Sequence, residues 1–299
     1  MRRAFVTADV FTATKGAGNP LAVVLDCVGL TDAQMQMIAR EFNISETTFV
    51  FPPKAPDQAA FVRIFTPARE LPFAGHPMIG TAVVLARRHK SQKGAPLNRM
   101  VLEVPAGLVE IEVSGDQSGT TSATCAVPKL PAMHSPSPTV GQVAAALSLS
   151  PSDINVADRP IQTWDAGYAV VFAALTSKDA VSRAKVDLSK WPSTTEFGRP
   201  TSIYPYAATG SSRFYARMFA PTMGIPEDPA TGGAAAALAG HLHACARLGD
   251  GLHRFIIDQG VDMGRPSEIT LEMEVAQGQL KRVRIGGAAV EFLAGSFEL

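Results

Sequence analysis

Residues 233–240, GAAAALAG, constrain the fold of this chain more than any other segment, because they belong to a helix that is apolar on every side. Such a helix is normally surrounded by other elements of secondary structure. Glycine and alanine are small enough for β-strands to approach the helix closely all round. We therefore expect a curved sheet wrapped around one central helix.

A second copy of this arrangement is visible earlier in the chain. The segment FTPARELP occupies residues 65–72 and FAPTMGIP occupies residues 219–226, so their phenylalanines and final prolines are each 154 residues apart (219 − 65 and 226 − 72). Each copy then runs through a glycine-containing loop, FAGHP or PATGG, into an apolar helix. Because the order of predicted strands and helices also returns, we predict a duplicated unit that contains both helices and strands.

The pattern along the chain gives the expected elements. Thr31 and Gln34 form a capping box for a helix that ends near Asn43, and a second helix is expected from about His76 to Lys90. Further on, we expect a helix over 178–191 and a closing β meander of the four segments RFIID, ITLEMEV, LKRVRI and AAVEFL.

A Pro/Ser-rich stretch at 127–140 is the expected linker between the two copies. The predicted domains are therefore 1–127, to which 288–299 can add a strand, and 128–299.

Composition narrows the classes of function. Lysine plus arginine and aspartate plus glutamate both number 27, so the chain lacks the positive charge that nucleic acid or an anionic membrane attracts. No run of apolar residues reaches the length of a membrane span. Three cysteines are too few and too scattered for a disulfide framework. We expect a cytoplasmic protein that binds neither nucleic acid nor membrane.

The loops before the two apolar helices predict an anion site. The first N–H groups of a helix lack intrahelical partners and carry a partial positive charge. Gly75, Gly232 and Gly233 stand at these helix starts and let a ligand approach the backbone. If the two copies face each other, both helix starts meet at one cleft, and a carboxylate is the natural ligand there.

Several separated motifs in this chain resemble one known family. The segments DVFTATKGAGNPLAVVLD, FNISETTFVF, IFTPARELPFAGHPMIGTAVVLA and GIPEDPATGGAAAALAGHL, followed by QGVDMGRPSEI, are similar to the phenazine-biosynthesis isomerase (PhzF-like) family. The resemblance covers essentially the whole chain. It implies a diaminopimelate epimerase-like α+β fold, with two pseudo-symmetric domains, each a mixed β barrel-like sheet around a central helix, and a site between them.

The resemblance also implies roles for individual residues. Glu46 matches the acid/base glutamate of the family, and His76 and Asp228 match two polar residues that line the same cleft. The predicted substrate-binding residues are Asn19, Ser45, Gly75, Thr231, Gly232 and Gly233. The family loop often reads DPATGSA, whereas this chain has DPATGGA, so Gly233 removes a hydroxyl group beside the predicted anion site.

The cysteines argue against one related chemistry. Epimerases and racemases of this fold use two cysteines, one near each central helix, as bases on opposite faces of a carbon atom. Cys27, Cys125 and Cys245 lie outside both loops, so we expect small buried side chains instead.

Together these features predict an isomerase that needs no metal and no organic cofactor. A single carboxylate, Glu46, would remove a proton from one carbon of a small carboxylate-bearing substrate and return it to another, provided that burial raises its pKa toward the working pH. Two alternatives remain open: an epimerase or lyase-like enzyme that uses Glu46 and Asp228 as two bases, and a non-catalytic ligand-binding or interaction module. The resemblance further implies a homodimer.

Overall fold

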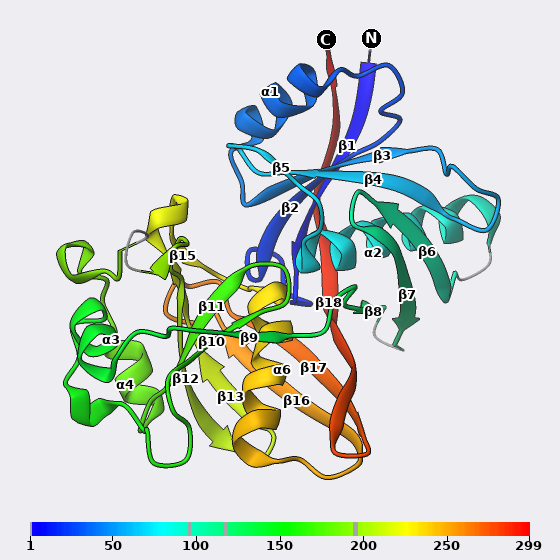
Figure 1. Ribbon diagram of the computed structural model, residues 1–299. Coiled ribbons are helices and arrows are strands. Elements are labelled where there is room, and N and C mark those ends of the chain that lie inside the picture. Colours follow the sequence, from blue (N-terminus) through cyan, green and yellow to red (C-terminus); the bar gives the residue numbers. More distant parts are fainter. Residues whose placement is uncertain (1, 95–96, 117–118, 194–196) are drawn as a thin grey trace. The chain divides into compact units, whose positions relative to one another are not determined.

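The computed structural model describes residues 2–94, 97–116, 119–193 and 197–299 (Figure 1). The chain divides into unit 1, which contains Met1–Pro128 and Gly286–Leu299, and unit 2, which contains Lys129–Ile285. The last strand, β18 (Gln279–Glu298), begins in unit 2 and continues into unit 1.

The strands of unit 1 form a closed ring. Hydrogen-bonded neighbours follow the order β1, β2, β3, β4, β6, β7, β8 and β18, and β18 pairs again with β1. The strands of this unit are β1 Arg2–Val10, β2 Asn19–Val24, β3 Glu46–Phe51, β4 Ala60–Phe65, β5 Glu70–Leu71, β6 Arg99–Val104, β7 Gly107–Gly115 and β8 Thr121–Ala126. Its helices are α1 Asp32–Phe42 and α2 Gly75–Lys93, and α2 contacts β1, β2, β3, β7 and β8.

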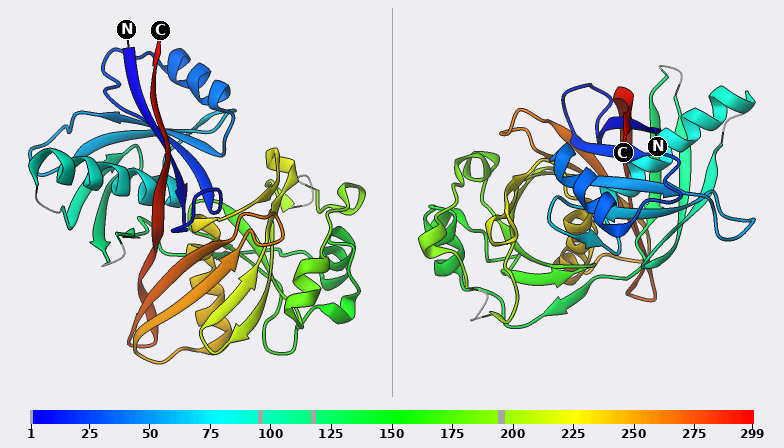
Figure 2. Two further views of the ribbon diagram at one scale, coloured as in Figure 1. Left: turned by 180° about the vertical axis from the view of Figure 1, so that it is seen from behind. Right: turned by 90° about the horizontal axis from the view of Figure 1, so that it is seen from above.

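Unit 2 has a similar order of strands and helices, with helix α6 (Gly232–Ala246) at its centre. Its strands are β9 Ala132–His134, β10 Gln162–Asp165, β11 Ala169–Ala174, β12 Ile203–Gly210, β13 Arg213–Ala216, β14 Met218–Ala220, β15 Ile225–Asp228, β16 Gly251–Gln259 and β17 Ser267–Ala276. The remaining elements are α3 Val140–Ala146, α4 Lys178–Arg183 and the 3-10 helices Pro151–Asp153, Leu188–Lys190 and Pro221–Met223. Helix α6 contacts β9, β10, β11 and β17, and Figure 2 shows it from two further sides.

The two units share one pattern of strand directions. In unit 1, α1 links the parallel strands β2 and β3, and α2 lies between the parallel strands β4 and β6. In unit 2, α4 links the parallel strands β11 and β12, and α6 lies between the parallel strands β13 and β16. Antiparallel pairs separate these crossovers in both units. This pattern confirms the predicted α+β fold with two pseudo-symmetric copies around central helices.

Several predicted elements are confirmed at the level of single residues. Thr31 and Gln34 cap α1 reciprocally, with Gln34 Oε1 accepting from the Thr31 backbone N–H at 2.9 Å. Helix α1 ends at Asn43, whose φ of 49° is left-handed. Met35 and Ile38 lie in the core of unit 1 beside Phe49 and Phe65.

Two sequence-based predictions of elements are wrong. The helix expected over 178–191 stops at Arg183 and is followed by a short 3-10 turn. The last two segments of the expected meander are one continuous strand, β18, because the glycines at 286 and 287 fit inside a strand and do not turn the chain. The division between the two units, after Pro128, falls within the expected linker 127–140, and the rest of that stretch contains strand β9, which pairs with β10.

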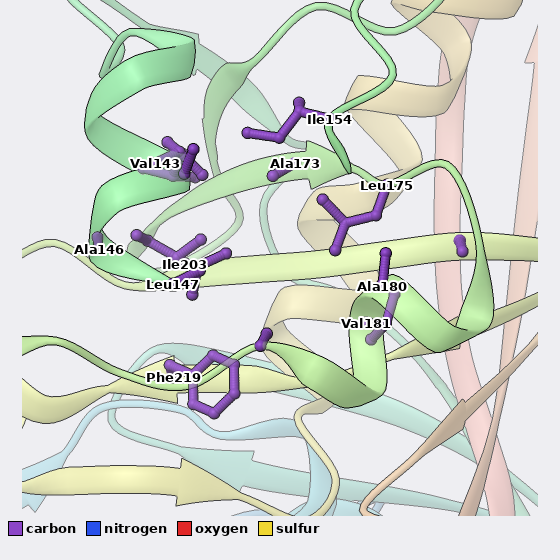
Figure 3. Packing of buried hydrophobic residues seen from close by; sticks show 14 of the residues in the cluster. Val143, Ala146, Leu147, Ile154, Ala173, Leu175, Ala180, Val181, Ile203 and Phe219 are labelled. Atoms are coloured by element: carbon purple, nitrogen blue, oxygen red, sulfur yellow. The ribbon is translucent and has the colours of Figure 1, made fainter. Parts of the chain in front are cut away.

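A second apolar layer covers the outer face of the unit 2 sheet (Figure 3). Its buried side chains come from α3, α4, β11, β12 and β14 and from the residues that directly follow α3 and β11. They include Val143, Leu147, Leu175, Val181, Ile203 and Phe219. Helices α3 and α4 therefore pack against strands that are already covered by α6 on the inner side. Strand β11 is accordingly buried along almost its whole length.

Small residues let α6 fit inside its sheet. Ala234 to Gly240 are all buried. A Cβ atom on Gly240 would stand 2.4 Å from Cε3 of Trp164 and 2.8 Å from Cβ of Pro131. The helix and the strands therefore approach each other through the space that a side chain at position 240 would fill.

We predict that Gly240→Ala destabilises the protein by about 1–3 kcal/mol, because the added methyl group overpacks the contact with Trp164. Helix propensity alone would favour alanine by about 0.5–1 kcal/mol. Urea-induced unfolding measures the net change in the free energy of unfolding that these two effects produce. The control is Gly141→Ala in α3, where the structure places no described atom within 4 Å of an added Cβ. Equal stability changes in the two variants would contradict the packing argument.

Candidate active site

The N-terminal ends of β2, β3 and α2 place three of the predicted residues together in unit 1. Strands β2 and β3 run parallel, with Leu21 opposite Glu46. Asn19, Pro20 and Glu46 therefore lie at the same end of the two strands. Nε2 of His76, the second residue of α2, lies 3.2 Å from Oε2 of Glu46. Both side chains are largely buried, with exposed fractions of 6% and 15%.

The imidazole of His76 is neutral at physiological pH. Burial lowers the pKa of His76 to about 3, and a hydrogen bond to the backbone carbonyl of Pro20 opposes this shift only in part. Because Nε2 faces Glu46, we assign the N–H that binds the Pro20 carbonyl to Nδ1. Nε2 then presents a lone pair to the carboxyl group, so the contact is not an ion pair. When Glu46 is protonated, the lone pair on Nε2 of His76 lies 3.2 Å from its Oε2 atom and can accept that proton.

Helix α2 begins without a capping side chain. Ala74 occupies the N-cap position, and the first turn contains no acidic residue. Gly75 is buried at this helix start, and Ser45 is half-buried beside Glu46. Asn19 is fully buried at the start of β2. The first N–H groups of α2 therefore lie next to the Glu46–His76 pair and receive no side-chain oxygen from the N-cap residue.

Asp228 lies at the equivalent helix start in unit 2. It is the last residue of β15, and its Oδ2 accepts a hydrogen bond from the hydroxyl group of Thr231. Thr231 is the N-cap residue of α6, but its hydroxyl group does not cap the helix because it turns toward Asp228. Within the described part of the chain, α2 and α6 are the α-helices that begin without a side-chain cap; Thr and Ser side chains cap α1, α3 and α4.

A buried glutamine that the sequence analysis missed holds this loop in place. Gln259 Nε2 donates to the Asp228 carbonyl at 2.8 Å and to Thr231 Oγ1 at 2.9 Å. Gln259 Oε1 accepts from the Thr231 backbone N–H at 3.2 Å and from the Tyr204 hydroxyl at 2.9 Å. Burial, and secondarily the charge of Asp228, raises the pKa of Tyr204, so its hydroxyl remains a donor.

Gly260 and Arg217 complete the support of the loop. Gly260 has a φ of +72°, and a Cβ there would stand 2.5 Å from the carbonyl oxygens of Pro229 and Arg265. Arg217 binds both carboxylate oxygens of Glu227 at 2.8 Å. This pairing engages Glu227, the neighbour of Asp228. Gln259 and Gly260 belong to the motif QGVDMGRPSEI. Their contacts with residues 228–231 could not be predicted, because the two segments are distant in the sequence.

The first turn of α6 is open to solvent at one residue. Gly232 is buried, whereas Gly233 is partly accessible and lies against the ring of Tyr168. Tyr168 could not be predicted from the sequence, since nothing in its local pattern distinguishes it from other loop residues.

The described cysteine and acidic side chains form no metal site, and two of the thiols are held protonated by burial. Burial raises the pKa of Cys27 to about 12 and also raises the pKa of Cys245, so both are protonated thiols at neutral pH. Among the described residues there is no group of three or more histidine, cysteine, aspartate or glutamate side chains placed to hold a metal ion. No helix in the described ranges combines the length and apolar character that a membrane crossing requires.

Comparison with known proteins decides the family. The family model described as phenazine biosynthesis-like protein matches residues 8–295. The chain belongs to this family. It is 41% identical over 299 residues to an isomerase of Mesorhizobium japonicum, with 98% of each chain covered. It is 36% identical over 304 residues to the trans-2,3-dihydro-3-hydroxyanthranilate isomerase of Pseudomonas fluorescens, with 99% of each chain covered.

A solved structure supports the fold. The PhzF-family phenazine biosynthesis protein of Bacillus anthracis matches with a TM-score of 0.87 over 100% of both chains, at 24% identity. The expected family and fold are therefore confirmed, and so is the expected enzyme class, since relatives that are 34–41% identical over nearly the whole chain are isomerases.

We predict that His76 makes the protein less stable in acid. The folded-state pKa of about 3 lies below the ordinary 6.5, so between these values the unfolded chain binds a proton that the folded chain does not. Stability is therefore lost as the pH falls below 6.5. Between about pH 7.5 and pH 5, His76 should account for a loss of about 2 kcal/mol in the free energy of unfolding.

Urea unfolding at both pH values, on the wild type and on His76→Gln, measures this difference. The variant should lose that part of the pH dependence. His253→Gln is the control, because its imidazole lies on β16 outside the buried core and binds the Gly249 carbonyl at 2.7 Å. An unchanged pH dependence in His76→Gln would show that His76 is not held neutral.

Proposed function

We propose that this isomerase moves a proton within a small carboxylate-bearing substrate without a cofactor, and that Glu46 is the group that carries the proton. One observation supports this most strongly. The carboxyl group of Glu46 lies 3.2 Å from a buried, neutral imidazole, at the uncapped start of α2. A carboxyl group, a neutral base and backbone N–H donors at a helix start are the groups that such a reaction requires.

The proposed reaction balances without an oxidant or a reductant. The Glu46 carboxylate takes the proton from a C–H bond, and the electron pair of that bond delocalises into the substrate. Backbone N–H groups at the helix start stabilise the negative charge that develops. The proton on Glu46 exchanges with solvent in part of the turnovers, and Glu46 then delivers a proton to another carbon atom. The lone pair on Nε2 of His76 accepts a hydrogen bond from the carboxyl group while it holds the proton.

The substrate's own carboxylate is the group that we assign to the helix starts. Each helix start offers partial positive charge and unpaired N–H groups. We propose that residues from both units, Gly75 on α2 and Gly232–Gly233 on α6, bind one substrate, with Asn19, Ser45 and Thr231 as further contacts. The Pseudomonas fluorescens relative acts on a cyclic amino acid, trans-2,3-dihydro-3-hydroxyanthranilate, and a cyclic or amino-acid-like carboxylate is our proposed substrate class. The homodimer, the cytoplasmic location and the absence of nucleic-acid partners stay predictions.

A second candidate reaction is epimerisation. Asp228 stands at the start of α6 as Glu46 stands near the start of α2, so each unit offers one carboxylate beside an uncapped helix. Two carboxylates on opposite faces of one carbon atom would invert a stereocentre. A proton shift by Glu46 alone would instead move the proton from one carbon atom to another, without inverting a carbon by removal and return on opposite faces.

The first test uses a thermal-shift screen of small carboxylates, including anthranilate, proline and trans-2,3-dihydro-3-hydroxyanthranilate. A ligand at 100 times its Kd stabilises the folded state by about 2.7 kcal/mol. We expect the same carboxylates to stabilise the wild type and Glu46→Gln, because the amide keeps the shape of the side chain. The exchange of a carbon-bound hydrogen with deuterated water should be about 10²–10⁴-fold slower in Glu46→Gln.

The matched control is Glu110→Gln, since Glu110 is exposed on β7. Undiminished exchange in Glu46→Gln would refute its role as the proton carrier. If no carboxylate stabilises any variant, the anion site is refuted and a non-catalytic binding module becomes the better description.

The position of the deuterium separates the two reactions. For the proposed proton shift, we expect a product with the label at a new carbon, and Asp228→Asn should still exchange the hydrogen that Glu46 removes. For epimerisation, the label appears at an inverted stereocentre, and Asp228→Asn loses inversion. Mass spectrometry together with chiral chromatography of the product distinguishes these outcomes.

A further inference from the structure

The opening at the first turn of α6 is filled by an aromatic ring from a different element. A Cβ atom built on Gly233 would stand 2.8 Å from Cε1 of Tyr168, and 3.6 Å from both its Cζ and its hydroxyl oxygen. Tyr168 belongs to the loop between β10 and β11, 65 residues away along the chain (233 − 168). The ring therefore occupies the volume into which a side chain at position 233 would project.

This contact lies where solvent reaches the helix start. Gly232 and Ala234 are buried, whereas Gly233 and Tyr168 are both partly accessible. A phenol ring at this place forms a wall for whatever approaches the first turn of α6. It also brings a hydroxyl group near the position from which a serine at 233 would present one.

We infer that Tyr168 is a specificity-determining residue of this isomerase, because its ring takes the place of a side chain at position 233 and limits the size of the carboxylate that the start of α6 accepts. This inference rests on the proposed function, in which Gly232 and Gly233 bind the substrate's carboxylate. It adds that Gly233 and Tyr168 act as a pair. The ring leaves room only for glycine at position 233, and it bounds the site where a larger residue at 233 would otherwise do so.

The pairing is tested first without any ligand. Gly233→Ala should lower the Tm by about 2–4 °C or more, because the methyl group meets the ring. In a Tyr168→Ala background the same substitution should leave the Tm unchanged or raise it. Gly141→Ala is the matched control, since Gly141 is also the second residue of its helix and no described atom lies within 4 Å of its added Cβ. Additive effects of the two substitutions would overturn the pairing.

Selectivity is tested with a graded series of acetate, benzoate and 2-naphthoate, whose dissociation constants are measured by calorimetry for the wild type, Tyr168→Ala and Tyr168→Phe. Tyr168→Ala should shift the ratio of the naphthoate and acetate constants by about tenfold or more toward the larger ligand. Tyr168→Phe keeps the ring and should keep the wild-type ratio, which separates the wall from the hydroxyl group.

The outcomes distinguish this inference from the proposed function. If the wild type binds carboxylates and Tyr168→Ala leaves the ratio unchanged, the specificity role is overturned and the proposed function stands. If neither the wild type nor the variants bind any carboxylate, both are overturned, even where the Tm values show that the ring and the glycine are coupled.

Discussion

The burial of helix α6 on all sides is the constraint from which the rest of unit 2 follows. Only glycine and alanine at most positions allow strands to approach the helix from several directions, and the ring of Trp164 lies directly against Gly240. A polar side chain inside this packing needs partners. His241 is fully buried and has them in Tyr206 and Gln162, at 2.9 and 3.0 Å. Because the middle of the helix is tightly packed, the candidate ligand-binding groups lie at its start.

The candidate functional groups lie at the start of each central helix, where the buried packing ends. Side-chain oxygens cap the outer helices α1, α3 and α4, whereas the two central helices begin at alanine or at a threonine whose hydroxyl group is turned away. Uncapped N–H groups are unfavourable unless water or a ligand binds them. In unit 2 the hydroxyl of Thr231 is held by Asp228 and Gln259, so the loop itself keeps this helix start without a cap.

The sequence allowed the central helices, the duplication and the family to be predicted, because these depend on local composition and on order along the chain. Gly75, Glu46, His76 and Asp228 could be picked out from their motifs. The roles of Gln259, Arg217 and Tyr168 could not, because each acts through a contact with a segment that is distant in the sequence. The same reason explains the error at β18: local spacing does not reveal that one strand continues from unit 2 into unit 1.

The most direct test of the proposed site is an NMR titration of the glycine backbone amides with anthranilate, using protein labelled at glycine nitrogen. If one carboxylate binds at both helix starts, the amide signals of Gly75 and Gly232 should shift together, with a single dissociation constant. Signals from glycines far from both helix starts, such as Gly94 at the other end of α2 and Gly278 in the turn before β18, should stay in place. Shifts confined to one helix start, or two different dissociation constants, would contradict a single substrate site that is built from both units.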